Sequence, residues 1–278
     1  MPSWYELGME KIPISAVGNF DNLRRKRAAR VVKMDWWLDP VLFARRAGFQ
    51  PDERQLAVLR STAPRGILNC CRQWGKSTVT AAKALHHAYG APKRLVVVGS
   101  ATERQSGEFL LKARTMAREL GITPVGDGIH SCSLQLPNGS RLVGLPQNEE
   151  GVRGLTATLL VVDEAARVAD SFYKALRPMV ATTAGAIWLM STPLEKRGFF
   201  YDAWQTGDLW ERFQVKATEC ERIPAAFLEE ERSAMGDAWF RQEYLAEFMD
   251  IGGGFFAREM VEAALVDELE PFDLRMRS

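Results

Sequence analysis

The sequence predicts an α/β fold in which a mostly parallel sheet is covered by helices on both faces. Short apolar runs at residues 95–98, 159–162 and 186–190 do not alternate with polar residues, which is typical of strands buried on both sides. Segments of helical length separate these runs, and that alternation favours parallel pairing. Ligands bind beyond the carboxyl ends of the strands in such sheets, so the residues that follow each run are the first candidates for function.

The individual elements can be placed from the same patterns and from turn residues. The predicted strands lie at residues 66–70, 94–99, 159–162 and 186–190. The predicted helices lie at residues 36–47, 52–60, 76–88, from the cap at 100–102 to about 120, and 171–176. The first helix should bury an apolar side formed by Trp36, Trp37, Leu38, Val41, Leu42 and Phe43. Asn138-Gly139 predicts a hairpin within residues 131–145.

Composition and charge exclude several classes of protein. The chain has 278 residues, of which 46% are hydrophobic and 26% charged, so it has room for one large domain or two small ones and is not disordered as a whole. Its apolar runs are far shorter than the roughly 18 residues of a membrane span, and no membrane protein is expected. A formal net charge of +1 does not by itself indicate a nucleic-acid binder. The four cysteines form no CxxC pair and the N-terminus carries no secretory signal, so a reducing cytoplasm is expected.

A phosphate-binding loop is predicted after the first strand. Gly75-Lys76-Ser77 matches the end of the pattern GxxxxGK[ST], while Cys70 stands where the first glycine is expected. Gly75 would let the backbone approach phosphates, Lys76 would bridge the β- and γ-phosphates, and Ser77 would bind Mg²⁺. Arg72 would add a forked donor for the γ-phosphate. The alternative is an ordinary strand–loop–helix unit, and on the tripeptide alone the two interpretations are equal.

An acidic pair follows the strand expected at residues 159–162. Asp163 would hold the Mg²⁺ shell, and Glu164 would orient and deprotonate an attacking water as a general base. Taken alone, the pair could equally be a helix N-cap and a first-turn carboxylate. Because an upstream Gly-Lys-Ser also follows a strand, the two motifs together predict a P-loop NTPase with a RecA/ASCE-like sheet.

The order of these motifs resembles the ATPase domain of large terminase subunits, the DNA-packaging motors of tailed bacteriophages. That family reads R-x-x-G-K-[ST] in its phosphate loop, and Arg72-Gln73-Trp74-Gly75-Lys76-Ser77 fits this pattern. The resemblance extends from about Trp36 to Phe256. The other segments that agree are residues 51–55, 138–140, 152–154, 191–193, 198–201 and 240–248.

The resemblance implies a role for each matched residue. The ATP-binding residues would be Gln55, which would contact adenine, with Arg72, Gln73, Trp74, Gly75, Lys76, Ser77 and Thr78. Glu164, Lys76 and Arg72 would be catalytic, and Ser77 and Asp163 would bind Mg²⁺. Ser191 and Thr192 would couple hydrolysis to movement, although a strand-ending turn is the alternative. Arg153 would be a phosphate sensor or a DNA contact, with a surface ion pair as the alternative.

The same resemblance implies the setting in which the chain would act. Its cofactors would be ATP and Mg²⁺, and its partners double-stranded DNA, a terminase small subunit and a portal protein. A homo-oligomer is expected when the protein is active, because an arginine acting in trans would come from a neighbouring subunit. The place of action would be the cytoplasm of the bacterial host.

Three regions are expected along the chain. Residues 1–33 would form a basic N-terminal extension, whose cluster at 24–30 is either a solvated face or a nucleic-acid contact. Residues 34–250 would form the P-loop ATPase domain, and residues 251–278 a C-terminal tail or severed linker. This tail is too short for the RNase H-type nuclease domain of full-length terminases, so no nuclease activity is expected.

Two other functions remain open from the sequence. A helicase-like DNA-dependent ATPase shares the loop and the acidic pair, but it would need a second RecA-like domain for which the chain after Pro193 is too short. A non-hydrolysing ATP-binding prophage remnant would explain the missing nuclease half. The intact set of Lys76, Ser77, Asp163 and Glu164 favours a working ATPase over such a remnant.

Overall fold

Seven strands of the described chain pair into one sheet with the order β3-β4-β2-β5-β6-β1-β7. The computed structural model describes residues 38–147, 154–206 and 208–250. The strands are β1 (Arg65–Cys70), β2 (Leu95–Ser100), β3 (Ser133–Gln135), β4 (Arg141–Pro146), β5 (Leu159–Asp163), β6 (Ala186–Ser191) and β7 (Glu211–Val215). Neighbouring strands run parallel except for β3 and β4. The predicted α/β class with a mostly parallel sheet is therefore confirmed.

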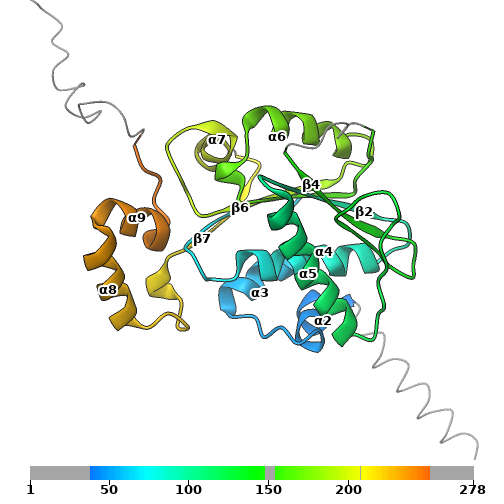
Figure 1. Ribbon diagram of the computed structural model, residues 1–278, viewed down its shortest axis with the longest axis horizontal. Helices are drawn as coiled ribbons and strands as arrows, with labels where there is room; N and C mark the ends of the chain where they lie inside the picture. The colour runs from blue at the N-terminus through cyan, green and yellow to red at the C-terminus, as the bar shows by residue number, and fades with distance from the viewer. Residues whose placement is uncertain (1–37, 148–153, 207, 251–278) are drawn as a thin grey trace, which may run out of the picture.

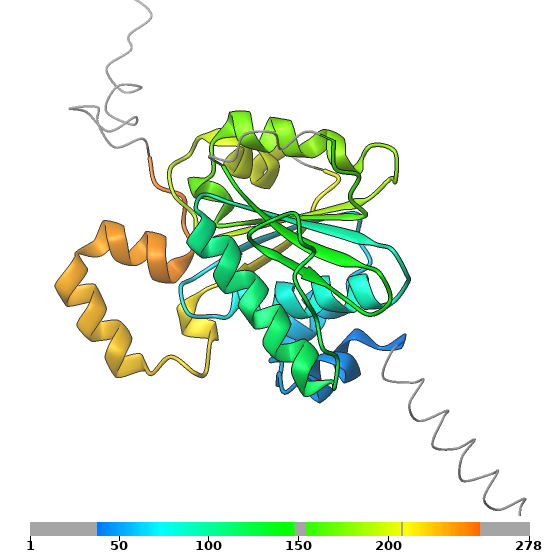
Figure 2. The ribbon, with the colours of Figure 1, turned by 45° about the vertical axis from the view of Figure 1, so that its right-hand side comes forward.

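Helices cover both faces of this sheet. They are α2 (Pro40–Arg46), α3 (Glu53–Arg60), α4 (Lys76–Tyr89), α5 (Glu103–Glu119), α6 (Asp170–Leu176), α7 (Gly198–Thr206), α8 (Ala225–Met235) and α9 (Asp237–Leu245). Figures 1 and 2 show α2 to α5 on one face and α6 and α7 on the other, while α8 and α9 lie beyond the edge strand β7. Within the described ranges, no helix combines the length and apolarity needed to cross a bilayer.

The strands divide their side chains between two apolar cores. Val96 and Val98 of β2 belong to the core beneath α4 and α5, whereas Val97 between them belongs to the core beneath α6. All three are fully buried. Because successive strand residues point to opposite faces, burial on both sides requires an unbroken apolar run. This is the physical reason why the strands of the sheet centre were recognisable in the sequence.

A glycine in β1 makes room for the largest side chain of the sheet. Gly66 lies opposite Trp188 of β6 in the parallel register. A Cβ atom at position 66 would lie 2.6 Å from the Trp188 ring, closer than real Cβ contacts come. The Trp188 side chain is fully buried and the ammonium of Lys83 lies over its ring, 4.3 Å from the centroid. A side chain at position 66 would therefore not fit beside Trp188 while β1 and β6 keep this pairing.

The first described helix differs from its prediction. It begins at Pro40, with Asp39 as the N-cap in an extended conformation, because a residue before proline avoids the helical region and proline suits the first helical position. Val41 and Phe43 are buried as predicted, but Leu38 and Leu42 are 78% and 42% exposed. The predicted apolar side was therefore wrong at these two leucines. Trp36 and Trp37 lie outside the described residues.

The remaining predicted elements agree with the structure to within a few residues. The hairpin forms between β3 and β4, with Gly139 at a φ of 79° in its turn. Thr102 caps α5 and Asp52 caps α3 through reciprocal bonds with the residue three positions on. Among the α-helices and strands of the described residues, α7, β7, α8 and α9 were not predicted. In β7 only Val215 is buried, so this edge strand has no apolar run to reveal it.

The C-terminal helices are fastened to the sheet at the end of β1. The backbone carbonyl of Ala246, just after α9, accepts from the Asn69 amide of β1 at 3.0 Å and from the Gln214 amide of β7 at 3.1 Å. The amide of Arg72 donates to the carbonyl of Glu243 at 2.9 Å. These contacts place α9 directly against the loop that follows β1.

Replacing Gly66 by alanine tests the fit between β1 and β6. The added methyl group collides with Trp188, and overpacking of this kind typically costs about 1–3 kcal/mol of unfolding free energy. Gly126→Ala is the matched control, because a Cβ atom there meets nothing within 4 Å. Urea unfolding should show the loss for Gly66→Ala alone. Equal stability of the two variants would contradict the proposed fit.

Candidate nucleotide-binding site

Three neighbouring strands bring the predicted motifs to one edge of the sheet. The order β5-β6-β1 is parallel throughout, so the carboxyl ends of these strands lie side by side. Asp163 ends β5, Ser191 ends β6, and the predicted phosphate loop follows β1 at Cys70. In the register, Asp163 lies opposite Met190, and Ser191 lies opposite Asn69. The structure thus brings together residues that lie far apart in the sequence.

The loop after β1 has the backbone of an anion-binding turn. Gln73 and Gly75 both adopt left-handed conformations, with φ values of 61° and 101°. Such turns allow successive backbone N–H groups to converge on one anion. Gly75 is also the N-cap of α4 and offers no capping side chain, so the first amides of this helix face the loop without a side-chain acceptor from the cap. The arrangement suits a phosphate group.

Lys76 is held at the centre of the site. Its side chain is buried, and its ammonium donates to the Thr192 hydroxyl at 2.9 Å and to the Cys71 carbonyl at 3.1 Å. A longer contact of 3.4 Å reaches the Cys70 carbonyl. A buried ammonium needs such acceptors because its desolvation is costly. The contact with Thr192 joins the phosphate loop to the predicted coupling pair at the end of β6.

Asp163 and Ser77 provide two adjacent oxygen ligands. The Ser77 hydroxyl donates to Asp163 Oδ1 at 3.4 Å, and the amide of Glu164 donates to the same oxygen at 2.9 Å. Burial and then the neighbouring charge of Glu164 raise the pKa of Asp163 to about 6, although Lys76 and the bond from Ser77 oppose this. A hydroxyl and a carboxylate oxygen fit Mg²⁺, which usually takes one or two protein ligands together with phosphate oxygens and water.

Glu164 directs its carboxylate into the same region from a strained backbone. Its φ of 49° and ψ of 45° lie in the left-handed region, which a residue with a Cβ atom adopts at some cost. Its Oε2 atom accepts from the Arg167 guanidinium at 3.1 Å, and the Ser191 hydroxyl, which donates to the Thr192 carbonyl at 2.6 Å, lies 3.4 Å from the same Oε2 atom. Ser191 is therefore in contact with the predicted general base, as Thr192 is with Lys76.

All of the predicted ATP-binding residues line one cavity of about 550 Å³. Arg72 to Thr78, Gln55 and Glu164 line it, while Asp163, Ser191 and Thr192 contact residues of the lining. Phe49, Lys112 and Arg222 also line the cavity and were not predicted. Lys112 lies in the middle of α5 and Arg222 in a loop near the C-terminal helices. No local pattern in the sequence marks either residue.

Both polar atoms of the Gln55 side-chain amide form hydrogen bonds. Its Oε1 accepts from the amide of Asp52 at 3.0 Å, and its Nε2 donates to the carbonyl of Trp74 at 2.9 Å. Arg222 Nη2 donates to the same carbonyl at 2.5 Å. Gln55 thus ties α3 to the phosphate loop in this structure. Its contact with adenine stays a prediction.

Glu243 makes two contacts with arginines at the site that no sequence pattern predicts. Glu243 of α9 has a fully buried side chain and forms ion pairs with Arg72 at 3.5 Å and with Arg167 at 3.2 Å. The segment at 240–248 resembled a terminase segment, but nothing in it indicated which residue would reach the site. Arg153 and the basic cluster at residues 24–30 lie outside the described residues.

The chain is similar to known terminase large subunits. The family model described as Terminase large subunit, T4likevirus-type, N-terminal, matches residues 67–263. The terminase large subunit of Thermus virus P23-45 is 25% identical over 248 residues, covering 76% of this chain and 51% of that protein. The chain therefore spans about half the length of the curated relatives it matches.

Solved structures show the same fold. The large terminase ATPase domain of Thermus phage P74-26 has a TM-score of 0.65 at 22% identity, covering 74% of this chain and 97% of that one. The large terminase of the thermophilic bacteriophage D6E, solved in complex with ATP-gamma-S, has a TM-score of 0.59 at 13% identity, covering 71% of this chain and 52% of that one. Both likenesses confirm the predicted α/β fold with a mostly parallel sheet.

Asp163→Asn tests the electrostatic cost of this site in the absence of metal. The folded pKa of about 6 lies above the ordinary value near 3.9, so the contribution of Asp163 to stability is present below about pH 4 and lost as the pH rises through 6. Ionised Asp163 should then cost about 3 kcal/mol at pH 7.5. Urea unfolding without Mg²⁺ should show Asp163→Asn to be more stable than wild type at pH 7.5 and nearly equal at pH 4.

The exposed Asp208 provides the control, since Asp208→Asn removes the same charge from the surface. It should change the unfolding free energy little at either pH. If Asp163→Asn is less stable than wild type at pH 7.5, the proposed cost of the buried carboxylate is wrong.

Proposed function

Because the chain belongs to the family of N-terminal domains of T4-like-virus-type terminase large subunits, we propose that it hydrolyses ATP to drive double-stranded DNA into viral procapsids. The observation that carries the proposal is the convergence of Lys76, Asp163 and Glu164 around the cavity beside the phosphate loop. A cation, a metal ligand and a general base at one end of a phosphate-sized turn are the parts that ATP hydrolysis requires. The solved complexes of the D6E large terminase with ADP and ATP-gamma-S support nucleotide binding.

In this proposal each part of the chain has a distinct task at the γ-phosphate. The amides of residues 73–77 and the Lys76 ammonium bind the phosphate oxygens, and Arg72 adds a further donor. Mg²⁺, held by Ser77 and Asp163, would neutralise phosphate charge. Glu164 accepts a proton from water as the water oxygen bonds to the γ-phosphorus, and the bond from that phosphorus to the bridging oxygen breaks to leave ADP and phosphate.

The end of β6 is placed to couple hydrolysis to movement. Thr192 contacts Lys76 and Ser191 contacts Glu164, so both residues touch groups whose surroundings change when the γ-phosphate leaves. The chain continues from Thr192 into α7, which packs on the opposite face of the sheet from α4. A change in these two hydrogen bonds would therefore act on a neighbouring helix, as a two-state switch requires.

The proposed partners follow from the family and not from contacts in this structure. They are double-stranded DNA, a terminase small subunit, a portal protein and further copies of the chain, acting in the bacterial host cytoplasm. Arg153 remains proposed as a phosphate sensor or DNA contact, and the expected lack of nuclease activity remains to be tested with plasmid DNA. The comparisons give no support to a helicase-like ATPase or a non-hydrolysing remnant over the main proposal.

Glu164→Gln tests the proposed chemistry directly. Glutamine keeps the size of the side chain but cannot accept a proton, so Mg²⁺-ATP turnover should fall by about 10²–10⁴-fold while ATP binding persists. Turnover should be measured with and without double-stranded DNA over a range of protein concentrations, because assembly is expected to raise the specific rate. Binding should be followed with a fluorescent ATP analogue.

Two further variants make the test selective. Lys76→Ala should lose both turnover and tight ATP binding, because it removes the cation from the phosphate end of the cavity. Glu108→Gln, which changes an exposed carboxylate of α5, should behave as wild type. Equal turnover by wild type and Glu164→Gln would refute the proposed role of Glu164.

A further inference from the structure

A row of four charged side chains runs from the phosphate loop to the proposed general base. Arg72 Nε lies 3.5 Å from Glu243 Oε2, and Glu243 Oε1 lies 3.2 Å from Arg167 Nη2. Arg167 Nη1 then lies 3.1 Å from Glu164 Oε2. Arg167 is therefore the direct link between the carboxylate proposed to activate water and a carboxylate of α9.

Glu243 is the most deeply buried of the three residues Glu164, Arg167 and Glu243. Its side chain is only 2% exposed, whereas those of Arg167 and Glu164 are 34% and 27% exposed. A buried carboxylate is stable only when it is paired and hydrogen-bonded, and Glu243 also accepts from the Gln242 amide at 3.1 Å. The backbone of Glu243 is tied to Arg72 as well. The position of Glu243 therefore limits where the Arg167 guanidinium can lie.

The geometry of Arg167 suits a side chain that orients Glu164. Its two terminal nitrogens contact two different carboxylates in the fixed planar geometry of a guanidinium, which an ammonium does not reproduce. Arg167 and Ser191 both contact Oε2 of Glu164. Among the described residues, no hydrogen bond or ion pair engages the other oxygen, Oε1. Oε2 is thus held in place by its neighbours, and Oε1 is available to accept a hydrogen bond from water.

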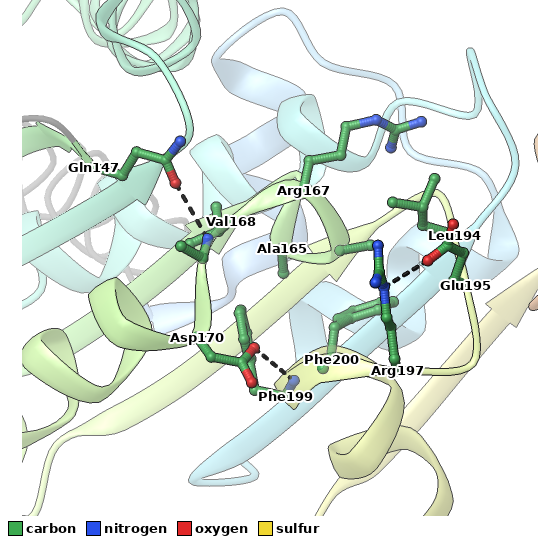
Figure 3. A pocket seen from close by; sticks show the side chains of 13 residues that line it. Gln147, Ala165, Arg167, Val168, Asp170, Leu194, Glu195, Arg197, Phe199 and Phe200 are labelled. Carbon is green, nitrogen blue, oxygen red and sulfur yellow. Dashed lines mark hydrogen bonds and ion pairs between the residues drawn. The ribbon is translucent and has the colours of Figure 1, made fainter. Parts of the chain in front are cut away.

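The Arg167 guanidinium does not contact Glu195 or Asp170, the other acidic residues that line the neighbouring cavity. It ends the short 3-10 helix Ala165–Arg167 and lines a second cavity of about 760 Å³ beside the site. In Figure 3 its side chain extends away from the contact between Arg197 and Glu195 and from that between Asp170 and Phe199. These two acids have partners of their own, and the Arg167 guanidinium contacts Glu164 and Glu243 instead.

We infer that Arg167 is a positioning residue for hydrolysis, which fixes the carboxylate of Glu164 and is itself anchored by Glu243 on α9. The inference rests on the proposed function, because it assigns Arg167 to the same reaction without placing it on the substrate. Since a displacement of about 1 Å in a reacting group can cost 10²-fold in rate, holding Glu164 should affect kcat and not the binding of ATP.

The experiment compares Arg167→Ala and Arg167→Lys with wild type in Mg²⁺-ATP turnover. Arg167→Ala should lower kcat by about 10–100-fold and leave KM within about threefold, because the phosphate contacts are untouched. Arg167→Lys should recover only part of the loss, since an ammonium keeps the charge but lacks the planar fork that places a separate nitrogen against each carboxylate. Arg197→Ala removes the arginine paired with Glu195 beside the same cavity and should keep the wild-type kcat.

A double variant separates positioning from a purely structural role. If Arg167 acts through Glu164, then Glu164→Gln with Arg167→Ala should be no slower than Glu164→Gln alone, because residues that act as a unit are not additive. The inference is overturned if the two substitutions lower kcat independently, so that their effects multiply in the double variant. It is also overturned if Arg167→Ala keeps the wild-type kcat, or if Arg167→Ala lowers kcat by unfolding the protein and Arg167→Lys does not restore it. If the wild-type protein hydrolyses ATP and any of these results is found, only this inference is overturned. If the wild-type protein does not hydrolyse ATP, the proposed function is overturned.

Discussion

The parallel register of β5, β6 and β1 is the constraint on which the site depends. It brings Asp163, Ser191 and the loop after Cys70 to the same edge of the sheet, although long segments of chain separate them. Packing away from the site is compatible with that register, since Gly66 leaves space for Trp188 and the two apolar cores cover the strands from both sides. Strand pairing and packing in the interior thus together hold the groups that are proposed to act on a phosphate.

Charged side chains are concentrated at this edge of the sheet, and burying them lowers the stability of the fold. Lys76 and Asp163 are both buried, and Glu164 adopts a left-handed backbone beside them. Burial of an ionised group is unfavourable unless partners compensate, and the raised pKa of Asp163 shows that compensation here is incomplete. Lys76 is better satisfied, through Thr192 and two loop carbonyls. A site that is electrostatically unsatisfied on its acidic side is suited to gain a cation along with its anionic substrate.

The sequence predicted the parts of this structure whose signals are local. Apolar runs marked the central strands, Asn138-Gly139 marked the hairpin, and Gly75-Lys76-Ser77 with Asp163-Glu164 marked the two loops that meet at the cavity. It did not mark β7, because an edge strand with one buried residue has no apolar run. Nor did it mark Lys112, Arg222 or Glu243, since each reaches the site through tertiary packing from a distant element. Leu42 was assigned wrongly because three successive helical residues point in different directions around the axis, and Val41 and Phe43 take the buried positions.

The position of α9 follows from the same contacts and explains why the C-terminal helices belong to the site. Ala246 is bound by Asn69 and Gln214, one residue from each of the two last strands of the sheet, while Glu243 is bound to the loop after β1 by its backbone and by its side chain. A helix held at both of these points cannot move independently of the phosphate loop. Exposed ion pairs contribute little energy each, about 0–1 kcal/mol, so the pairing of Arg72 alone would not secure it. The buried Glu243 and the hydrogen bonds to backbone groups hold α9 against the phosphate loop. Helix α9 is therefore part of the structure of the site.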